Sequence, residues 1–387
     1  MLSIRHRLIC FFTAAICVTS VGVKADESPS GKERSDSIVV YIGTYTGKKS
    51  QGIYVCRLDP ATGALTKPEL AGEMINPSWV TIHPNHKFLY ACGEYGPFKG
   101  GSAIGAFAIK SDGTLTSLNQ QPAAGGGPCY AIVDNAGKNV LVANYGTGSV
   151  ADLPIATDGS LSPAGSVDQH PNTDAKQKPH AHCVDLDPDN RFAVSCDAGL
   201  DKLFVYRFDS DKGTLTANDP PTVELAPKTA PRHLVFSHDG RFAYVITEAA
   251  LTVVVFTYDA EHGVFHEIQS ISTVPAGLTG QGLSTAELVL HPSGKFLYGS
   301  NRGHDSIVGY AIDQSTGKLT LIGNTPTQGK SPRGFGIDPT GRWLIAGNQN
   351  SDSLVEFKID QKTGELLATG TKYELGTPVC VKFMEAK

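Results

Sequence analysis

The sequence predicts an all-β protein, a seven-bladed β-propeller of four-stranded antiparallel blades whose ring is closed by the C-terminal strand completing blade one. Three observations predict this fold. Gly (42) and Pro (23) are frequent in the 387-residue chain and charged residues make up only 18%, which is typical of short strands joined by tight turns. A sequence block recurs with a period near fifty residues, and each end of the chain carries part of one repeat.

The recurring block is an apolar run, a turn and a second apolar run, as in residues 289–298 and 336–345. The turn residues of six successive copies are His86, Gly137, Asn190, Gly240, Gly294 and Gly341. These positions lie 51, 53, 50, 54 and 47 residues apart. A period of this length, with several short strands in each unit, is typical of a propeller in which each unit forms one blade.

The chain ends predict how the ring closes. Residues 38–46, 53–58 and 65–71 have the pattern of the second, third and fourth strands of a unit that lacks its innermost strand. Residues 378–383 have the pattern of a first strand with nothing after it. One strand from the tail and three from the head would complete blade one and leave no open sheet edge.

Residues 1–25 predict a signal peptide, with a basic start, an apolar stretch at 8–23 and a small-residue cleavage pattern at 23–25. An uncleaved membrane anchor is the alternative. Residues 26–37 are polar and predict a tether. We therefore expect an exported protein, periplasmic or secreted, that keeps no integral membrane segment after signal cleavage and whose propeller spans residues 38–387.

Charge and cysteine content exclude other classes. The net charge of −5 and the lack of any basic block argue against nucleic-acid binding. The six cysteines after residue 25 match no zinc-ligand spacing and lie in apolar, strand-like runs. We expect small buried side chains, with one disulfide as the alternative. They are Cys56, Cys92, Cys129, Cys183, Cys196 and Cys380.

Propeller topology places two positions of every repeat at one mouth of the central channel: the start of the first strand and the residue just past the second. Residues that recur in several blades are expected to serve the scaffold. Asn144, Asn301 and Asn348 recur at one position, and Asp201, Asp305 and Asp352 open the third strand. Charged or titratable residues that break the repeat lie in blades four to seven. They are His180, His182, Arg232, Glu248, Glu287, Arg302, His304 and Arg333. Their mixed charges predict an anion-binding and acid–base site at a solvated mouth.

Several of these residues also fit purely structural roles. Arg232 and Arg333 share a Pro-Arg sequence, so either could pair with a neighbouring blade. Glu248 could form a buried ion pair with Arg232, which would set the charge state of the carboxylate. His180 and His182 could suit a metal, but no third ligand is spaced to complete a site. His304 could contact only solvent. We expect no metal or organic cofactor.

The motifs at 41–46, 179–182 (Pro-His-Ala-His), 231–234 (Pro-Arg-His-Leu), 301–306 (Asn-Arg-Gly-His-Asp-Ser) and 348–353 resemble those of the seven-bladed lactonase family. That family includes the propeller-type bacterial 6-phosphogluconolactonases and the fungal carboxy-muconate lactonizing enzymes. The resemblance covers the chain after the predicted tether. It implies that His182, Arg232, Glu248 and Arg302 form the catalytic set; we expect His180, Glu287, His304 and Arg333 to bind substrate.

The implied reaction is hydrolysis of a sugar-acid lactone, a small-molecule substrate. His182, with an ordinary pKa near 6.5, would take and return a proton. Arg232 or Arg302 would hold the oxyanion or a substrate carboxylate or phosphate, and Glu248 would orient water or fix the His tautomer. Two departures from the family pattern are Thr247, where Asn is usual, and the predicted export. A non-catalytic propeller that binds carbohydrate or protein, and a muconate-type cycloisomerase, are the alternatives.

Overall fold

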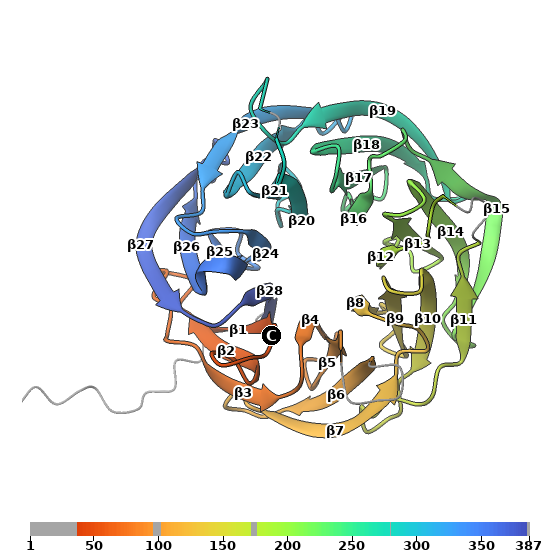
Figure 1. The fold of residues 1–387 in the computed structure, drawn as a ribbon, viewed down its shortest axis with the longest axis horizontal. Helices are drawn as coiled ribbons and strands as arrows, with labels where there is room; N and C mark the ends of the chain where they lie inside the picture. The colour runs from red at the N-terminus through yellow and green to blue at the C-terminus, as the bar shows by residue number, and fades with distance from the viewer. Residues whose placement is uncertain (1–36, 96–101, 172–175, 279, 385–387) are drawn as a thin grey trace, which may run out of the picture. The chain divides into compact units, whose positions relative to one another are not determined.

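The computed structural model describes residues 37–95, 102–171, 176–278 and 280–384, so the predicted signal peptide lies outside the described residues. Within them the chain forms seven four-stranded antiparallel sheets, which are the blades of a ring (Figure 1). A 3-10 turn, η1 (Gln349–Ser351), follows the second strand of blade seven. No helix in these ranges is long and apolar enough to cross a bilayer. The predicted fold class is confirmed.

In blades one to four the strands run outward from the channel in the following order. Blade one contains β28 (Pro378–Met384), β1 (Ile38–Thr44), β2 (Gly52–Leu58) and β3 (Glu69–Glu73). Blade two contains β4 (Pro77–Ile82), β5 (Phe88–Gly93), β6 (Ala103–Ile109) and β7 (Leu115–Pro122). Blade three contains β8 (Pro128–Val133), β9 (Asn139–Asn144), β10 (Ser149–Pro154) and β11 (Ser166–Gln169). Blade four contains β12 (Ala181–Leu186), β13 (Phe192–Asp197), β14 (Lys202–Asp209) and β15 (Thr214–Glu224).

The remaining three blades follow the same order. Blade five contains β16 (Pro231–Phe236), β17 (Phe242–Thr247), β18 (Thr252–Asp259) and β19 (Val264–Ser272). Blade six contains β20 (Ser284–Leu290), β21 (Phe296–Arg302), β22 (Ser306–Ile312) and β23 (Leu319–Pro326). Blade seven contains β24 (Pro332–Ile337), β25 (Trp343–Asn348), β26 (Ser353–Ile359) and β27 (Leu366–Glu374).

The two chain ends meet in blade one, as predicted. β28 pairs antiparallel with β1, with Val40 opposite Phe383 and Ile42 opposite Val381 (Figure 1). The fourth strand of this blade differs from the expected range of 65–71, because β3 begins only at Glu69. Pro68 has no N–H to donate and interrupts the ladder, so Leu65 forms only an isolated bridge with Leu58.

The turn that leads from the first strand to the second is the best predicted local feature. In six blades its turn residue has a positive φ: His86 (60°), Gly137 (68°), Asn190 (59°), Gly240 (67°), Gly294 (69°) and Gly341 (71°). Gly adopts this left-handed conformation without a steric penalty, which explains why it occupies four of the six positions.

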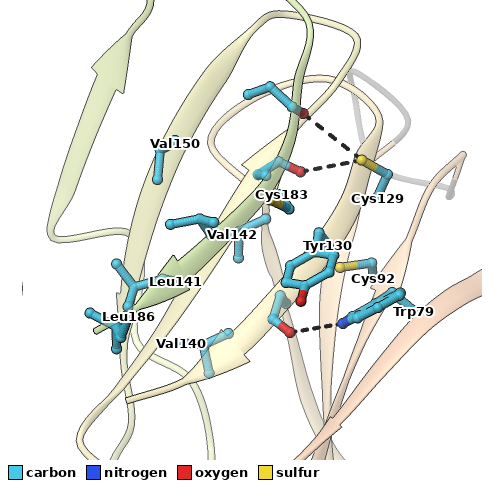
Figure 2. Close-up of a cluster of buried hydrophobic side chains, with 14 of the residues drawn as sticks. Trp79, Cys92, Cys129, Tyr130, Val140, Leu141, Val142, Val150, Cys183 and Leu186 are labelled. Atoms are coloured by element: carbon cyan, nitrogen blue, oxygen red, sulfur yellow. Dashed lines mark hydrogen bonds between the residues drawn. The ribbon is translucent and has the colours of Figure 1, made fainter. Parts of the chain in front are cut away.

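Buried apolar strands of adjacent blades pack into continuous cores. Figure 2 shows part of one such cluster, which includes Val140 and Val142 of β9 and the rings of Trp79 and Tyr130. Trp79 Nε1 donates a hydrogen bond to the Ala131 carbonyl at 2.9 Å, which joins blade two to blade three. The six cysteines are buried and unpaired, so the prediction of small core side chains is confirmed.

The recurring polar residues join blades, as expected of scaffold positions. Asn144 Nδ2 donates to the Ala123 carbonyl at 3.0 Å, and Asn301 Nδ2 donates to the Thr273 carbonyl at 2.8 Å. Both carbonyls lie where the preceding blade ends. Asp352 accepts the backbone N–H of Thr377 at 2.9 Å, just before β28. These side chains fix each blade to its neighbour.

Candidate active site

An irregularity at the start of each innermost strand delivers side chains to the channel mouth. The register of β16 against β17 shifts between Pro231 and His233. The equivalent shifts in β12 and β24 leave His182 and Arg333 unpaired, as Arg232 is unpaired in β16. A bulge of this kind bends the strand and redirects the extra side chain. The sequence-predicted residues at this position therefore face the channel because the strand is bulged there.

Glu248, which directly follows β17, is the centre of a charged cluster. Its Oε2 accepts a hydrogen bond from Arg232 Nε at 3.1 Å, and its Oε1 lies 2.9 Å from Arg302 Nη2. Burial would raise the pKa of Glu248, but Arg232 and Arg302 outweigh burial and hold this pKa below its usual value. The carboxylate is therefore ionised at neutral pH. The ion pair with Arg232 was expected from the sequence; the second pair, with Arg302, was not.

Both arginines are also anchored to backbone carbonyls. Arg232 Nη1 donates to the Ala286 carbonyl and Arg302 Nη2 donates to the Thr285 carbonyl, each at 2.7 Å. Within the described ranges, Arg232 Nη2 and Arg302 Nη1 have no hydrogen-bond acceptor. Burial lowers the pKa of Arg232 to about 10, which leaves the guanidinium charged at neutral pH. Each arginine thus keeps donors for a ligand.

His182 lies on β12 beside this cluster and is only 5% exposed, while Arg232 is 2% exposed. The expectation of a solvated position was wrong for both, because the bulges turn them into the space between the innermost strands. Burial, reinforced by Arg232 and His233, lowers the pKa of His182 well below its usual value. The expectation that the pKa of His182 lies near 6.5 was therefore wrong. His182 is neutral at neutral pH, with Nδ1 lying 3.7 Å from Cys129 Sγ.

Aromatic rings form one side of the mouth. The rings of His180 and Tyr145 stack with centroids 4.4 Å apart, and His180 Nδ1 donates to the Tyr145 carbonyl at 2.9 Å. The Tyr145 ring also lies edge-on to His182, with centroids 5.4 Å apart. Tyr145 is 39% exposed, so part of this residue is accessible next to His182.

Arg333 approaches the mouth from blade seven. Its guanidinium lies 5.7 Å from the ring centroid of Tyr45, whose hydroxyl donates to Glu94 Oε2 at 2.6 Å. Burial opposes the charge on Arg333, but Tyr45 and Glu94 outweigh it and raise the pKa of this guanidinium. Neither Tyr45 nor Glu94 was among the site residues predicted from the sequence. Each follows the second strand of its own blade, β1 or β5, and so occupies the repeat position from which Glu248 and Arg302 were predicted.

The structure does not bring Glu287 and His304 into the Glu248 cluster. His304 Nδ1 contacts Ser306 Oγ at 2.7 Å within its own turn. Glu287 is 4% exposed and its Oε1 lies 2.9 Å from His233 Nδ1. With Asp185 and Lys382, Glu287 lines a cavity of about 400 Å³ bounded by the far ends of β12, β16 and β20. It is therefore placed deeper than the mouth.

Comparison with known proteins matches this architecture to one family. The family model described as "Lactonase, 7-bladed beta-propeller" matches residues 39–383. The chain belongs to this lactonase family. It is 37% identical over 299 residues to a protein named 6-phosphogluconolactonase from Bacillus subtilis (strain 168), covering 76% of this chain and 83% of the relative. A protein of the same name from Formosa agariphila is 30% identical over 315 residues, covering 76% and 85%.

Solved structures agree with this assignment. The structure of the periplasmic gluconolactonase of Pseudomonas aeruginosa is similar with a TM-score of 0.84 and 33% identity, covering 91% of this chain and all of the other. In the described part of this lactonase-family chain, no group of three or more His, Cys, Asp or Glu side chains is placed to hold a metal ion. The site offers an ionised carboxylate, a neutral imidazole and three guanidinium groups.

Proposed function

We propose that the protein opens sugar-acid lactones at the channel mouth by hydrolysis. One observation carries this proposal: an ionised carboxylate, Glu248, is held by two arginines beside the neutral imidazole of His182. Each of these arginines has donors left for a ligand. Acyl transfer to water needs a proton acceptor and donors for the oxyanion, and these are the groups that meet at the mouth.

In the proposed reaction, neutral His182 accepts a proton from water as the water oxygen bonds to the lactone carbonyl carbon. Arg232 Nη2 donates to the developing oxyanion, which is worth roughly 10²- to 10³-fold in rate. The ring C–O bond then breaks, and His182 returns the proton to the ring oxygen; such acid–base help contributes roughly 10²- to 10⁴-fold. The negative charge of the oxyanion stabilises the transient imidazolium of His182 and so offsets the low basicity of this side chain.

The other mouth residues would hold the substrate. We assign Arg302 to keeping Glu248 in place, so that the carboxylate orients the attacking water. The exposed part of Tyr145, whose ring stacks on His180, would contact the sugar ring. Arg333 would bind an anionic group carried by the lactone. The names of the relatives, 6-phosphogluconolactonase and gluconolactonase, support a six-carbon aldonolactone as the substrate class.

Initial rates of ring opening test this function. We expect the wild-type protein to open glucono-δ-lactone or its 6-phosphate faster than the spontaneous reaction, and Glu248→Gln to lower kcat at least about a hundredfold. Asp352→Asn is the matched control, because this carboxylate binds Thr377 N and Lys49 Nζ and so joins blades seven and one; it should lower the melting temperature and leave kcat unchanged. A folded wild-type protein without activity would favour the non-catalytic binding alternative, and an active Glu248→Gln variant would place the site elsewhere.

We also propose that the protein works outside the cytoplasm. The pattern of residues 1–25 supports export, and the Pseudomonas aeruginosa relative is described as periplasmic. Intact-mass analysis of the protein from a bacterial extracytoplasmic fraction should show Asp26 as the first residue. Recovery of chains that retain Met1 would contradict this prediction.

A further inference from the structure

Two buried groups behind Arg232 have no part in the proposed chemistry. His233 is 2% exposed and Glu287 is 4% exposed. Glu287 Oε1 lies 2.9 Å from His233 Nδ1 and also accepts the backbone N–H of Leu288 at 3.1 Å. Burial raises the pKa of Glu287, whereas Lys382, Arg232 and the Leu288 N–H favour its ionised form. An ionised carboxylate can only accept hydrogen bonds, so with Glu287 ionised His233 carries its proton on Nδ1. The pair joins the innermost strands of blades five and six.

The His233 ring supports the Arg232 guanidinium. Arg232 Nη1 lies 3.0 Å from His233 Nε2 and 3.4 Å from Nδ1. The two ring nitrogens are separated by one carbon atom, so an atom this close to both lies over the face of the ring and outside its plane. A cation over a neutral aromatic face is attracted, whereas an imidazolium would repel it. This contact therefore requires a neutral His233.

The surroundings of His233 keep it neutral. Its ring lies edge-on to those of Trp79 and Tyr130, at 5.4 and 5.0 Å, and its centroid is 5.2 Å from that of His182. Burial lowers the pKa of His233 well below its usual value, and the charge of Arg232 lowers it further. Three more distant cations act in the same direction: Lys382 on β28, Arg333 on β24 and Arg302 on β21. Glu287 is the carboxylate in contact with the ring.

We propose that His233 and Glu287 are positioning residues for Arg232. Glu287 fixes His233 as the neutral Nδ1–H tautomer, and the face of that ring holds the guanidinium with Nε on Glu248 and Nη2 free for the substrate. Neither residue touches the lactone. The inference rests on the proposed function only for the role of Arg232; the tautomer and the ring contact are properties of the protein alone.

Matched variants test the positioning role. Glu287→Met removes the acceptor and frees the His233 ring to turn or to move its proton to Nε2, so kcat/KM should fall about ten- to hundredfold, mainly through kcat. The double variant His233→Phe with Glu287→Met restores a neutral aromatic face and leaves no buried carboxylate unpaired. It should regain about tenfold over Glu287→Met alone, because the two positions act through one contact. If Glu287 contacted substrate, the double variant would be no faster than the single one, and the proposal would fail.

Long-range ¹H–¹⁵N NMR of the wild-type protein tests the tautomer without any substrate. His233, assigned by the signals lost in His233→Phe, should carry a proton on Nδ1 and none on Nε2 at pH 7. A charged ring, or a proton on Nε2, would overturn the proposal. A protein that opened no lactone would contradict the proposed function, and this spectrum would still decide the state of His233.

Discussion

At the scale of single residues, the charge on Glu248 and the orientation of two arginines depend on each other. Glu248 binds Arg232 with one carboxylate oxygen and Arg302 with the other. Removing any one of the three would leave a partly buried charge with a partner missing, and such losses are larger than the worth of a single contact. The three residues therefore act as one unit, and the effects of substituting them should not be additive.

The depressed pKa of His182 leads to a prediction about pH. A general base works in its unprotonated form, and His182 and Glu248 both have pKa values below the usual ones. Both groups therefore stay unprotonated on acidification below pH 6.5. We expect kcat/KM at pH 5.5 to stay within about twofold of its value at pH 7.5, whereas a base with a pKa near 6.5 would lose about tenfold.

Rates measured from pH 5 to 8, with the spontaneous opening of the lactone subtracted at each pH, would check this prediction. A half-maximal point at pH 6.5 or above would show that an ordinary histidine is the base. Such a result would remove His182, as the structure places it, from the mechanism.

Charge that broke the repeat marked eight candidate residues in the sequence, and the family resemblance singled out His182, Arg232, Glu248 and Arg302 among them. This signal missed His233, because nothing in the Pro-Arg-His-Leu motif indicates that this histidine contacts Glu287 and the Arg232 guanidinium. Burial and pKa shifts could not be predicted, because they depend on how far each bulge turns a side chain into the channel. The expectation of a solvated His182 failed for this reason.

At the scale of elements, the blades repeat in backbone but differ in what their strands bury. β10 in blade three carries Asp152, which is fully buried and has no hydrogen-bond partner on either carboxylate oxygen among the described residues. Burial, with a smaller contribution from Asp134, raises the pKa of Asp152 to about 7. An unpartnered carboxylate in a strand interior costs stability once it ionises.

The burial of Asp152 therefore predicts that Asp152→Asn stabilises the protein by an amount that depends on pH. The pKa of Asp152 is higher in the folded protein than its ordinary value of 3.8. The folded state then binds more protons between pH 4 and 7, and stability falls as pH rises through that window. Asp152→Asn should match the wild type near pH 4 and be more stable at pH 8, by about 1–3 kcal/mol.

Chemical denaturation at pH 4.5 and pH 8 would measure this difference. Asp211→Asn, which removes an exposed carboxylate of blade four, controls for the loss of one negative charge. An Asp152→Asn variant that gained nothing at pH 8 relative to pH 4.5 would show that Asp152 finds a partner.

The elements themselves were largely predictable, since a turn that needs positive φ leaves a Gly or Asn at a fixed place in the repeat. The fourth strand of blade one was misplaced because the apolar pattern at 65–71 ignored Pro68. The bulges were not predicted at all. They arise where the innermost strand meets the second at the mouth. In five of the seven blades a Pro directly precedes the bulged residue: Pro77, Pro128, Pro231, Pro332 and Pro378. Because the chain has 23 Pro residues, Pro by itself does not mark a bulge in the sequence.

At the scale of the whole molecule, the closure of the ring links the ends of the chain. β28 pairs with β1 within blade one and packs against β24 and β4 of the neighbouring blades. Its side chains reach both the core and the channel: Cys380 is fully buried, and Lys382 Nζ lies 4.1 Å from the ring centroid of Trp79. The last strand therefore contributes to three blades at once.

Removing residues 378–387 should consequently destabilise the entire propeller. Without β28, β1 would become an open sheet edge and blades two and seven would lose their neighbour along the channel. We expect the deletion variant to melt at a lower temperature in one broad transition, or to aggregate. Deletion of residues 385–387 alone, beyond the last strand, is the control and should melt like the wild type. If the 378–387 deletion variant melted at the wild-type temperature, the stability of the ring would not depend on β28, and the proposed role of this strand in closing the ring would be wrong.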